Sequence, residues 1–173
     1  RTLQYYFAGI GAAPGGGDAI WGGMQDNGTG LLNPGSPQMV SPFGGDGGAV
    51  LVDPDNADRA VNEYVFMTMA RTENGGRSDG TTRSYTTITP TCASFIAIEF
   101  NPNPCDPNPR FIAPYLSDPK NLDHWVAGGQ MVWDNQGKGW DTVCNDTTCD
   151  WKMVRDLGAG SQTTGLGVSG STI

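Results

Sequence analysis

Short apolar runs separated by turns rich in Gly, Pro, Asp and Asn follow one another along the whole chain. Runs of this kind, bounded by turn-forming residues, predict β-strands. No segment combines an apolar period of about 3.6 residues with helix-forming residues, so we expect very little helix. The predicted strands cover residues 3–9, 19–24, 31–32, 38–43, 49–52, 61–69, 84–89, 95–100, 111–116, 125–132, 140–144 and 151–154.

The clearest hairpin signal is the turn Asp26-Asn27-Gly28, which precedes the short run Leu31-Leu32. Asn-Gly between two strand patterns favours a tight turn, because both central positions take positive φ. Gly22-Gly23, just before the turn, leaves room for another backbone to approach closely. A similar arrangement recurs at Gly128-Gly129, followed by residues 134–137. We therefore interpret the two stretches as equivalent parts of repeated units.

A second recurring feature is an Asp-Pro turn after an apolar run. The run 49–52 is followed by Asp53-Pro54, and the run 111–116 leads to Asp118-Pro119. The order of strand, Asp-Pro turn, strand, Asn-Gly-type turn and strand recurs about every 45–65 residues, which is typical of four-stranded propeller blades. A β-sandwich also has many short strands, but it would not repeat these turns. The sequence therefore predicts an all-β fold of four-stranded antiparallel blades, with successive sheets packed face to face.

The blade boundaries follow from the same pattern. We interpret residues 1–173 as one partial β-propeller domain with blades over 1–43, 44–90 and 91–155, and with the start of a further blade over 156–173. About three blades and a stub would leave sheet faces exposed. We therefore expect the chain to be a fragment of a larger protein or one chain of an assembled propeller, with the remaining blades as its partners.

Composition and charge narrow the function classes. Gly accounts for 26 of the 173 residues, and only three of the 18 acidic residues are Glu, which suits an all-β protein with many turns. The formal net charge of −8 argues against a nucleic-acid partner, because phosphate contacts need clustered Lys and Arg. No stretch reaches the roughly 18 apolar residues of a membrane span. The acidic surface suits calcium, cationic groups, neutral sugars or solubility alone.

Four cysteines stand at Cys92, Cys105, Cys144 and Cys149. Neither local pair has the two-residue gap of a zinc knuckle, and a single His leaves little to complete a metal site. Two sequence-local disulfides, Cys92–Cys105 and Cys144–Cys149, are the economical pairing, with buried free thiols as the alternative. Disulfides persist in oxidising compartments, so we expect a secreted or cell-surface protein, extracellular or periplasmic.

Residues 20–29, with Gly45-Asp46-Gly47-Gly48 and Val52-Asp53-Pro54 downstream, resemble the secreted β-propellers with BNR or Asp-box repeats. That group contains sialidase-like, sortilin-like and xyloglucanase-like proteins, whose Asp-boxes run Ser-x-Asp-x-Gly-x-x-Trp. Residues 133–140 keep the Gly and the Trp of this pattern but have Asn135 in place of the Asp and Trp133 in place of the Ser. The resemblance implies a propeller of six or more blades. The arginine triad of the sialidases has no visible counterpart among the seven Arg residues.

Asp26 and Asp46 are the candidate site residues. In a four-stranded blade, the turn between the second and third strands and the link to the next blade share one face, on which propellers usually bind ligands. The predicted ligand-face loops are therefore Gln25, Asp26 and Asn27 in the turn, and Gly45, Asp46 and Gly47 in the link. Paired carboxylates could hydrolyse glycosides, with a retaining mechanism at about 5 Å separation and an inverting one at roughly 6.5–9.5 Å.

The alternative for Asp26 and Asp46 is structural: each carboxylate hydrogen-bonds the backbone of its own turn. We adopt this alternative, so no catalytic residue is assigned. Calcium is a second alternative ligand for the pair, although no metal ligand is assigned and no other cofactor is expected. His124 lies beside Asp123, but no serine elbow accompanies it, and we interpret it as a loop histidine.

Three functional hypotheses remain open. The leading one is an extracellular propeller module that binds or scaffolds, with carbohydrate as one candidate ligand and no chemistry of its own. The second is part of a xyloglucanase-like or sialidase-like glycoside hydrolase that uses Asp26 and Asp46. The third is a structural subunit of a surface layer or filament, with which the acidic, Gly-rich composition is compatible.

Overall fold

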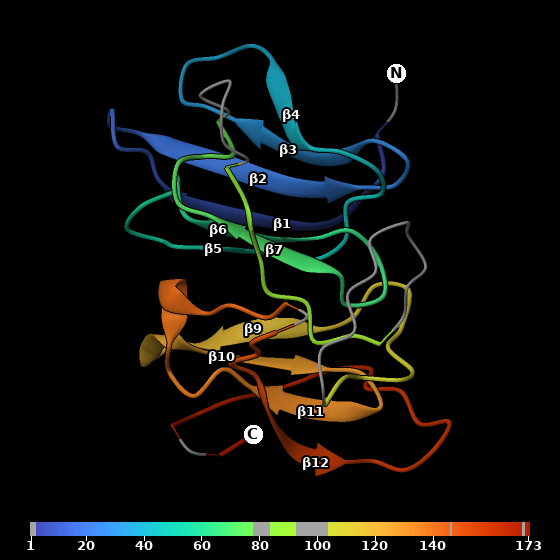
Figure 1. Ribbon diagram of the computed structural model, residues 1–173. Coiled ribbons are helices and arrows are strands. Elements are labelled where there is room, and N and C mark those ends of the chain that lie inside the picture. The colour runs from blue at the N-terminus through green and yellow to red at the C-terminus, as the bar shows by residue number, and fades with distance from the viewer. Residues whose placement is uncertain (1–2, 78–83, 93–103, 146, 171) are drawn as a thin grey trace. The chain divides into compact units, whose positions relative to one another are not determined.

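The computed structural model describes residues 3–77, 84–92, 104–145, 147–170 and 172–173. These residues are all-β and contain no α-helix. Their strands form three four-stranded antiparallel sheets, as the sequence predicts (Figure 1). Strands that are consecutive in the chain are neighbours in every sheet, and no sheet closes on itself. Open meanders of this kind fit the predicted incomplete propeller.

The three sheets follow one another along the chain. The first sheet consists of β1 (Tyr5–Ala12), β2 (Asp18–Met24), β3 (Gly28–Leu32) and β4 (Met39–Phe43). The second consists of β5 (Val50–Val52), β6 (Ala60–Glu63), β7 (Met69–Thr72) and β8 (Thr86–Thr87). The third consists of β9 (Tyr115–Asp118), β10 (Asn121–Gly128), β11 (Met131–Asp134) and β12 (Lys152–Asp156), with the 3-10 helix η1 (Gly139–Asp141) between β11 and β12.

The chain divides into two compact units. Unit 1 comprises residues 1–64 and 69–86 and holds the first two sheets, whereas unit 2 comprises residues 65–68 and 87–173 and holds the third sheet. Beyond Asp156 the described residues of unit 2 form no further named strand, and only a single bridge joins Ser169 to Thr172.

In unit 1 the first and second sheets pack face to face, as predicted. Trp21 is fully buried between them, and its indole Nε1 donates a hydrogen bond to the carbonyl oxygen of Ala57 over 2.8 Å. Small residues bring the sheets close together, since a Cβ at Gly11 would lie 2.3 Å from the carbonyl oxygen of Asp53. The cluster around the tryptophan consists of Ala19, Trp21, Leu31, Ala57 and Ala60.

In unit 2 the core is built on the third sheet. Trp125 and Trp133 are buried side chains of β10 and β11, and Trp125 packs edge-on against Trp140 with 4.9 Å between the ring centroids. Both predicted disulfides, Cys92–Cys105 and Cys144–Cys149, are formed.

Two predicted strands are wrong because a turn interrupts each of them. The prediction 61–69 is split into β6 and β7, since Phe66 and Met67 take positive φ values of 52° and 59°. The prediction 125–132 is likewise split, because the chain turns at Gly129 and Gln130 between β10 and β11. Apolar periodicity cannot detect either turn, because the residues in them are themselves apolar or are flanked by apolar ones.

Three other expectations in unit 2 need correction or lie outside the description. The first strand of the third sheet begins at Tyr115 and not at residue 111, because Pro114 precedes it and lacks an N–H for the ladder. The predicted strand 140–144 is the 3-10 helix η1 followed by irregular chain. The predicted strand 95–100 lies outside the described residues.

The proposed equivalence of the two Gly-Gly stretches is also wrong. Gly22 and Gly23 lie inside β2, whereas Gly129 lies in the turn after β10. The Asn27-Gly28 turn therefore joins the second and third strands of its sheet, whereas residues 135–137 follow the third strand. The Asp-Pro turns are equivalent, because Asp53 directly follows the first strand of its sheet, Asp118 ends the first strand of its sheet, and each accepts a backbone hydrogen bond from two residues further on.

Candidate functional site

The two loops predicted to share a face in unit 1 do lie together. The backbone N–H of Asp26 donates a hydrogen bond to Asp46 Oδ1 over 2.8 Å, and the N–H of Gly47 donates to the carbonyl oxygen of Met24 over 2.9 Å. Asn27 folds back within its turn, where its Nδ2 donates to the carbonyl oxygen of Gln25 over 2.6 Å.

The division of roles between the two aspartates differs from the prediction. Asp26 takes a positive φ of 57°, and its carboxylate accepts no hydrogen bond from the described residues. It is Asp46 whose carboxylate fastens the turn, by accepting the Asp26 N–H. Gly45 completes the link at a φ of 84°, where a Cβ would lie 2.2 Å from the ring of Tyr64. This pair therefore shapes the connection between the β2–β3 turn and the link that follows β4.

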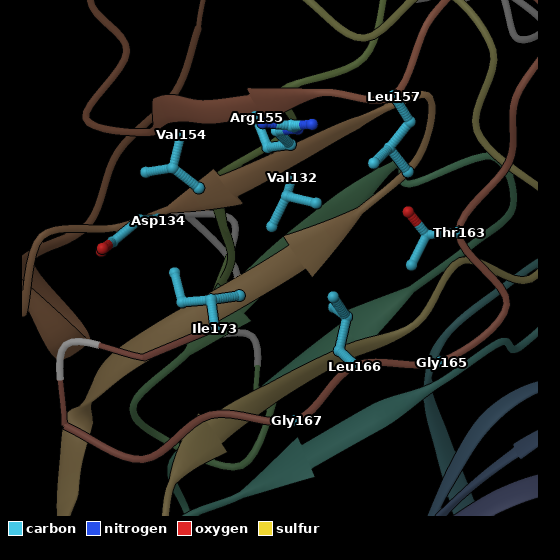
Figure 2. Close-up of a pocket in the computed structure, with 10 residues that line it drawn as sticks. All are labelled: Val132, Asp134, Val154, Arg155, Leu157, Thr163, Gly165, Leu166, Gly167 and Ile173. Atoms are coloured by element: carbon cyan, nitrogen blue, oxygen red, sulfur yellow. The ribbon is translucent and has the colours of Figure 1, made fainter.

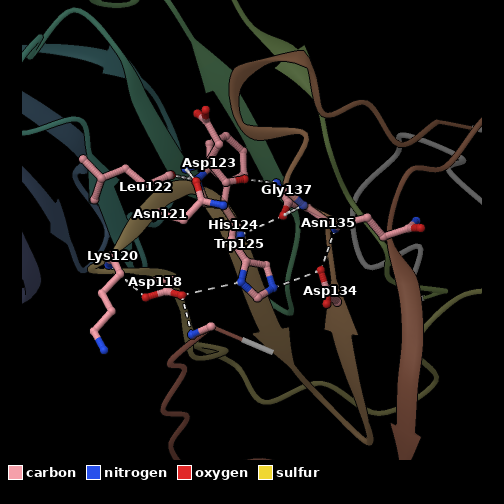
Figure 3. A network of polar contacts seen from close by, with 12 residues as sticks. Asp118, Lys120, Asn121, Leu122, Asp123, His124, Trp125, Asp134, Asn135 and Gly137 are labelled. Carbon is pink, nitrogen blue, oxygen red and sulfur yellow. Dashed lines mark hydrogen bonds and ion pairs between the residues drawn. The ribbon is translucent and has the colours of Figure 1, made fainter. Parts of the chain in front are cut away.

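A second polar cluster, formed by Asp118, His124 and Asp134, lies on one face of the third sheet in unit 2. Figure 3 shows the imidazole of His124 between two carboxylates. Its Nε2 lies 3.2 Å from Asp134 Oδ1, and its Nδ1 lies 3.9 Å from Asp118 Oδ2. The imidazole and Asp118 are buried, whereas Asp134 is partly exposed. When the imidazole is protonated, its charge lies between two acids.

Asp118 is held by the backbone on two sides. Its Oδ1 accepts from the N–H of Lys120 over 2.9 Å, and its Oδ2 accepts from the N–H of Gly170 over 2.6 Å. The hydrogen bond from Lys120 is the main reason that the pKa of Asp118 lies below its usual value; burial opposes this effect, whereas Gly170 and His124 add to it. Asp118 therefore stays ionised and fastens the C-terminal part of unit 2 to the sheet.

A pocket of about 630 Å³ opens on the same face of the third sheet, beside Asp134 (Figure 2). Its volume falls within the range of small-molecule sites, roughly 300–1,000 Å³. Its polar side chains are Asp134, Arg155 and Thr163, and its apolar ones are Val132, Val154, Leu157, Leu166 and Ile173. A mixed lining of this kind suits a ligand that has both charged and apolar parts.

The two charged side chains at the pocket, Asp134 and Arg155, have hydrogen-bonding groups without a partner among the described residues. The side chain of Arg155 forms no hydrogen bond or ion pair with the described residues. Asp134 Oδ1 accepts from the N–H of Gln136 over 2.5 Å and faces His124, whereas its Oδ2 has no partner in the described part of the chain. The carboxylate is thereby oriented by two neighbours and still has an oxygen free for a ligand.

The far wall of the pocket is formed by part of the segment 163–170, which we call the C-terminal strap. At one end, Thr163 donates from its N–H and from its Oγ1 to the carbonyl oxygen of Gly129, both over 2.8 Å. At the other end, the N–H of Gly170 is bound to Asp118. Gly165, Leu166 and Gly167 lie between these two anchors and face the pocket, as Figure 2 shows.

The described residues show neither a cluster of metal ligands nor a membrane-spanning helix. These residues contain no group of three or more His, Cys, Asp or Glu side chains placed to hold a metal ion. They also contain no helix that is both long and apolar enough to cross a membrane.

Sequence reasoning missed the site in unit 2, although it had singled out its parts. His124 was expected in a loop beside Asp123, but it lies in β10 and faces Asp134 of β11. The pairing depends on the strand register, in which Val126 stands opposite Asp134. The only available signal was the alternation of His124 with Val126 along one face of a strand, and that signal carries no information about the partner strand.

Comparisons with known protein families, with curated proteins and with solved structures find no match for this chain.

Proposed function

We propose that the chain is an extracellular binding module of the Asp-box propeller type, that it takes a small ligand in the pocket of unit 2, and that it performs no bond-making chemistry. The observation that carries this proposal is the pocket of unit 2. Asp134, whose Oδ2 has no partner among the described residues, and Arg155, whose side chain is unpaired, both line it. Unpaired charges on a pocket wall are groups that a ligand can bind without displacing an internal partner.

The support for Asp134 makes the pocket a prepared site. The carboxylate is fixed by Gln136 and by the buried His124, which is itself flanked by Asp118. Binding groups held by packed neighbours lose little freedom when a ligand arrives, and this lowers the cost of binding.

The extracellular part of the proposal is supported by the two disulfides, which are compatible with an oxidising compartment. No cysteine is left free, since the four thiols form two bonds.

The propeller type is supported by the turn that resembles an Asp-box. Asn135, at the position of the family's Asp, is fully buried, and its Oδ1 accepts from the N–H groups of Trp125 and Gly137 over 2.7 and 3.1 Å. Its Nδ2 donates to the carbonyl oxygen of Asp123 and to Thr142 Oγ1. The residue thus satisfies its amide inside the fold and acts as a structural element of the blade.

One face of the first sheet supports completion by further blades. Ile10 pairs with Ile20, Ile20 with Leu32 and Leu32 with Met39, so these four side chains share the face opposite to Trp21. Ile10 is 56% exposed and Ile20 is 38% exposed. An apolar row on the surface is typical of an interface, and a neighbouring sheet would cover it.

The binding function is tested by titrating methyl-labelled protein with a panel of free amino acids, dipeptides, disaccharides and short carboxylates, followed by NMR. We expect at least one class to shift the methyl signals of Val132, Val154 and Leu166, which line the pocket. The methyl signals of Ile10 and Ile20 in unit 1 are the internal control and should stay in place. If no member of the panel moves the three pocket signals, the pocket is not a binding site and the proposal is wrong.

A further inference from the structure

The ligand class can be inferred from the charges and their positions on the third sheet. Val132 stands opposite Arg155 in the β11–β12 ladder, and Asp134 lies two residues beyond Val132 on the same face. The ladder then shifts at a bulge, so that Asp134 stands opposite Lys152, and Arg155 is displaced from Asp134 by two residues of β11, roughly 6–7 Å along the strand. No ion pair joins them in the structure, and each lines the pocket. A ligand can therefore meet a negative group and a positive group at once.

The spacing of these charges favours an elongated zwitterion. A guanidinium binds a carboxylate through two parallel hydrogen bonds, and a carboxylate oxygen such as Asp134 Oδ2 accepts from an ammonium group. A free amino acid carries its two charged groups on the same carbon atom, whereas a dipeptide carries them on two successive residues. The displacement between Asp134 and Arg155 along the strands therefore suits the dipeptide better.

The remaining lining explains what the ligand's side chains would contact. Val154 and Leu157 are 44% and 43% exposed, and the strap adds Leu166 from the other side of the pocket. Covering such surface stabilises a complex by roughly 25 cal/mol per Å² of apolar area before the costs of association are subtracted. A ligand with Gly or with small polar residues would leave this apolar surface exposed to water.

We propose that the pocket of unit 2 binds dipeptide-sized zwitterions with apolar side chains, with Asp134 binding the ammonium group and Arg155 binding the carboxylate. This inference rests on the proposed binding function and names the ligand class of the same site. His124 acts as a positioning residue, because it touches the ligand-binding carboxylate and not the ligand.

The test uses the whole chain and four probes that differ by one feature each. Leucyl-leucine carries both charges and two apolar side chains. N-acetyl-leucyl-leucine lacks the ammonium group, leucyl-leucine amide lacks the carboxylate, and glycyl-glycine lacks the side chains. Affinities are measured by calorimetry and by the methyl shifts of Val132, Val154 and Leu166. We expect each of the three altered probes to bind about tenfold or more weakly than leucyl-leucine, because each loses a charge-assisted contact or the apolar contact.

Two variants assign the charges to their residues. In Asp134→Asn, leucyl-leucine and its acetylated form should bind with the same affinity; in Arg155→Gln, leucyl-leucine and its amide should do so. Arg110→Gln is the matched control, since Arg110 is an exposed arginine of the same unit that does not line the pocket. It should leave the ranking of the four probes unchanged. The unaltered protein supplies the ranking by itself, so a variant that fails to fold does not remove the test.

The outcomes separate this inference from the proposed function. If the acetylated or amidated probe binds as tightly as leucyl-leucine, the assignment of the charges is wrong. If a disaccharide or a simple carboxylate shifts the pocket methyl signals and leucyl-leucine does not, the ligand class is wrong and the binding function stands. If no probe shifts these signals, the binding function and the ligand class are both wrong.

Discussion

The backbone N–H of Asp26 donates to the carboxylate of Asp46, 20 residues further along the chain. The two acids that the sequence singles out are thus joined through the backbone of one and the side chain of the other. An acid engaged in this way is positioned to hold a turn. A catalytic acid would instead need an apolar, partly desolvated pocket that raises its pKa.

Replacing Asp46 should therefore cost more stability than replacing Asp26. We expect Asp46→Ala to lower the free energy of unfolding by about 1–2 kcal/mol, because the Asp26 N–H loses its charged acceptor. Asp26→Asn should change it by less than about 0.5 kcal/mol, because no hydrogen bond to that carboxylate is lost. Urea denaturation measures both, with Asp55→Ala as the control for removing an exposed Asp from a turn of the same unit.

The same variants test the glycoside hydrolase hypothesis. The parent protein should release no sugar from β-glucan, xyloglucan or sialoside substrates. An activity that falls by roughly a thousandfold in Asp26→Asn, with the fold intact, would show that the pair is catalytic.

The close approach of the first two sheets predicts a strong effect at Gly11. A Cβ there would lie 2.3 Å from the carbonyl oxygen of Asp53, and backbone atoms cannot move aside as a flexible side chain can. We expect Gly11→Ala to lower the free energy of unfolding by about 1–3 kcal/mol, within the range for overpacked interiors. Gly15→Ala is the matched control, since nothing lies within 4 Å of its Cβ position, and it should be neutral or slightly stabilising. Equal effects in urea denaturation would contradict this packing.

Acid should weaken unit 2 through Asp118. Its pKa is lowered in the folded protein, chiefly by the hydrogen bond from the N–H of Lys120. The unfolded chain therefore takes up a proton first, so the stabilisation is present above the ordinary Asp pKa of about 4 and is lost as the pH falls below it. Asp118→Asn should lack this component when unfolding is measured between neutral pH and strong acid. Parallel stability curves for the two proteins would contradict the assignment.

Alkali should weaken unit 1 through Tyr85. Burial raises the pKa of its hydroxyl, although the hydrogen bond from Asn62 Nδ2 at 3.1 Å acts in the opposite direction. The unfolded chain therefore loses its proton first, and stability should decline as the pH rises above the ordinary Tyr pKa of about 10. Tyr85→Phe should be less stable at neutral pH by about 1–2 kcal/mol, because the buried Asn62 loses a partner. It should also show a shallower alkaline decline in chemical denaturation.

The sheets could be predicted from the sequence because their signals are local. The Asn27-Gly28 turn places β2 against β3 in the register that the alternation of Trp21 and Leu31 requires. The disulfides could be predicted for a similar reason, since the even number of cysteines and their short spacings suggest the pairing. Both signals depend on residues that are close together in the sequence, so they can be recognised without knowledge of the fold.

The site in unit 2 could not be predicted because its parts meet only through the strand register. His124 of β10 contacts Asp134 of the neighbouring strand β11, and Gly170 binds Asp118, which lies 52 residues earlier in the chain. A turn at Phe66 and Met67 was equally hidden, because neither residue normally favours positive φ. In both places tertiary contacts decide the outcome, and these contacts leave no local pattern.

The buried carboxylate of Asp106 has a consequence for how the molecule is oxidised. Asp106 directly follows Cys105, and its oxygens accept from the N–H groups of Gln130 and Met131 and from the indole of Trp133. Its own carbonyl oxygen accepts from the N–H of Cys92 over 2.8 Å. The β10–β11 hairpin thus holds the segment that carries both thiols of this pair. A folded hairpin holds the two cysteines near each other and so raises their effective concentration, which favours the closing of this bond.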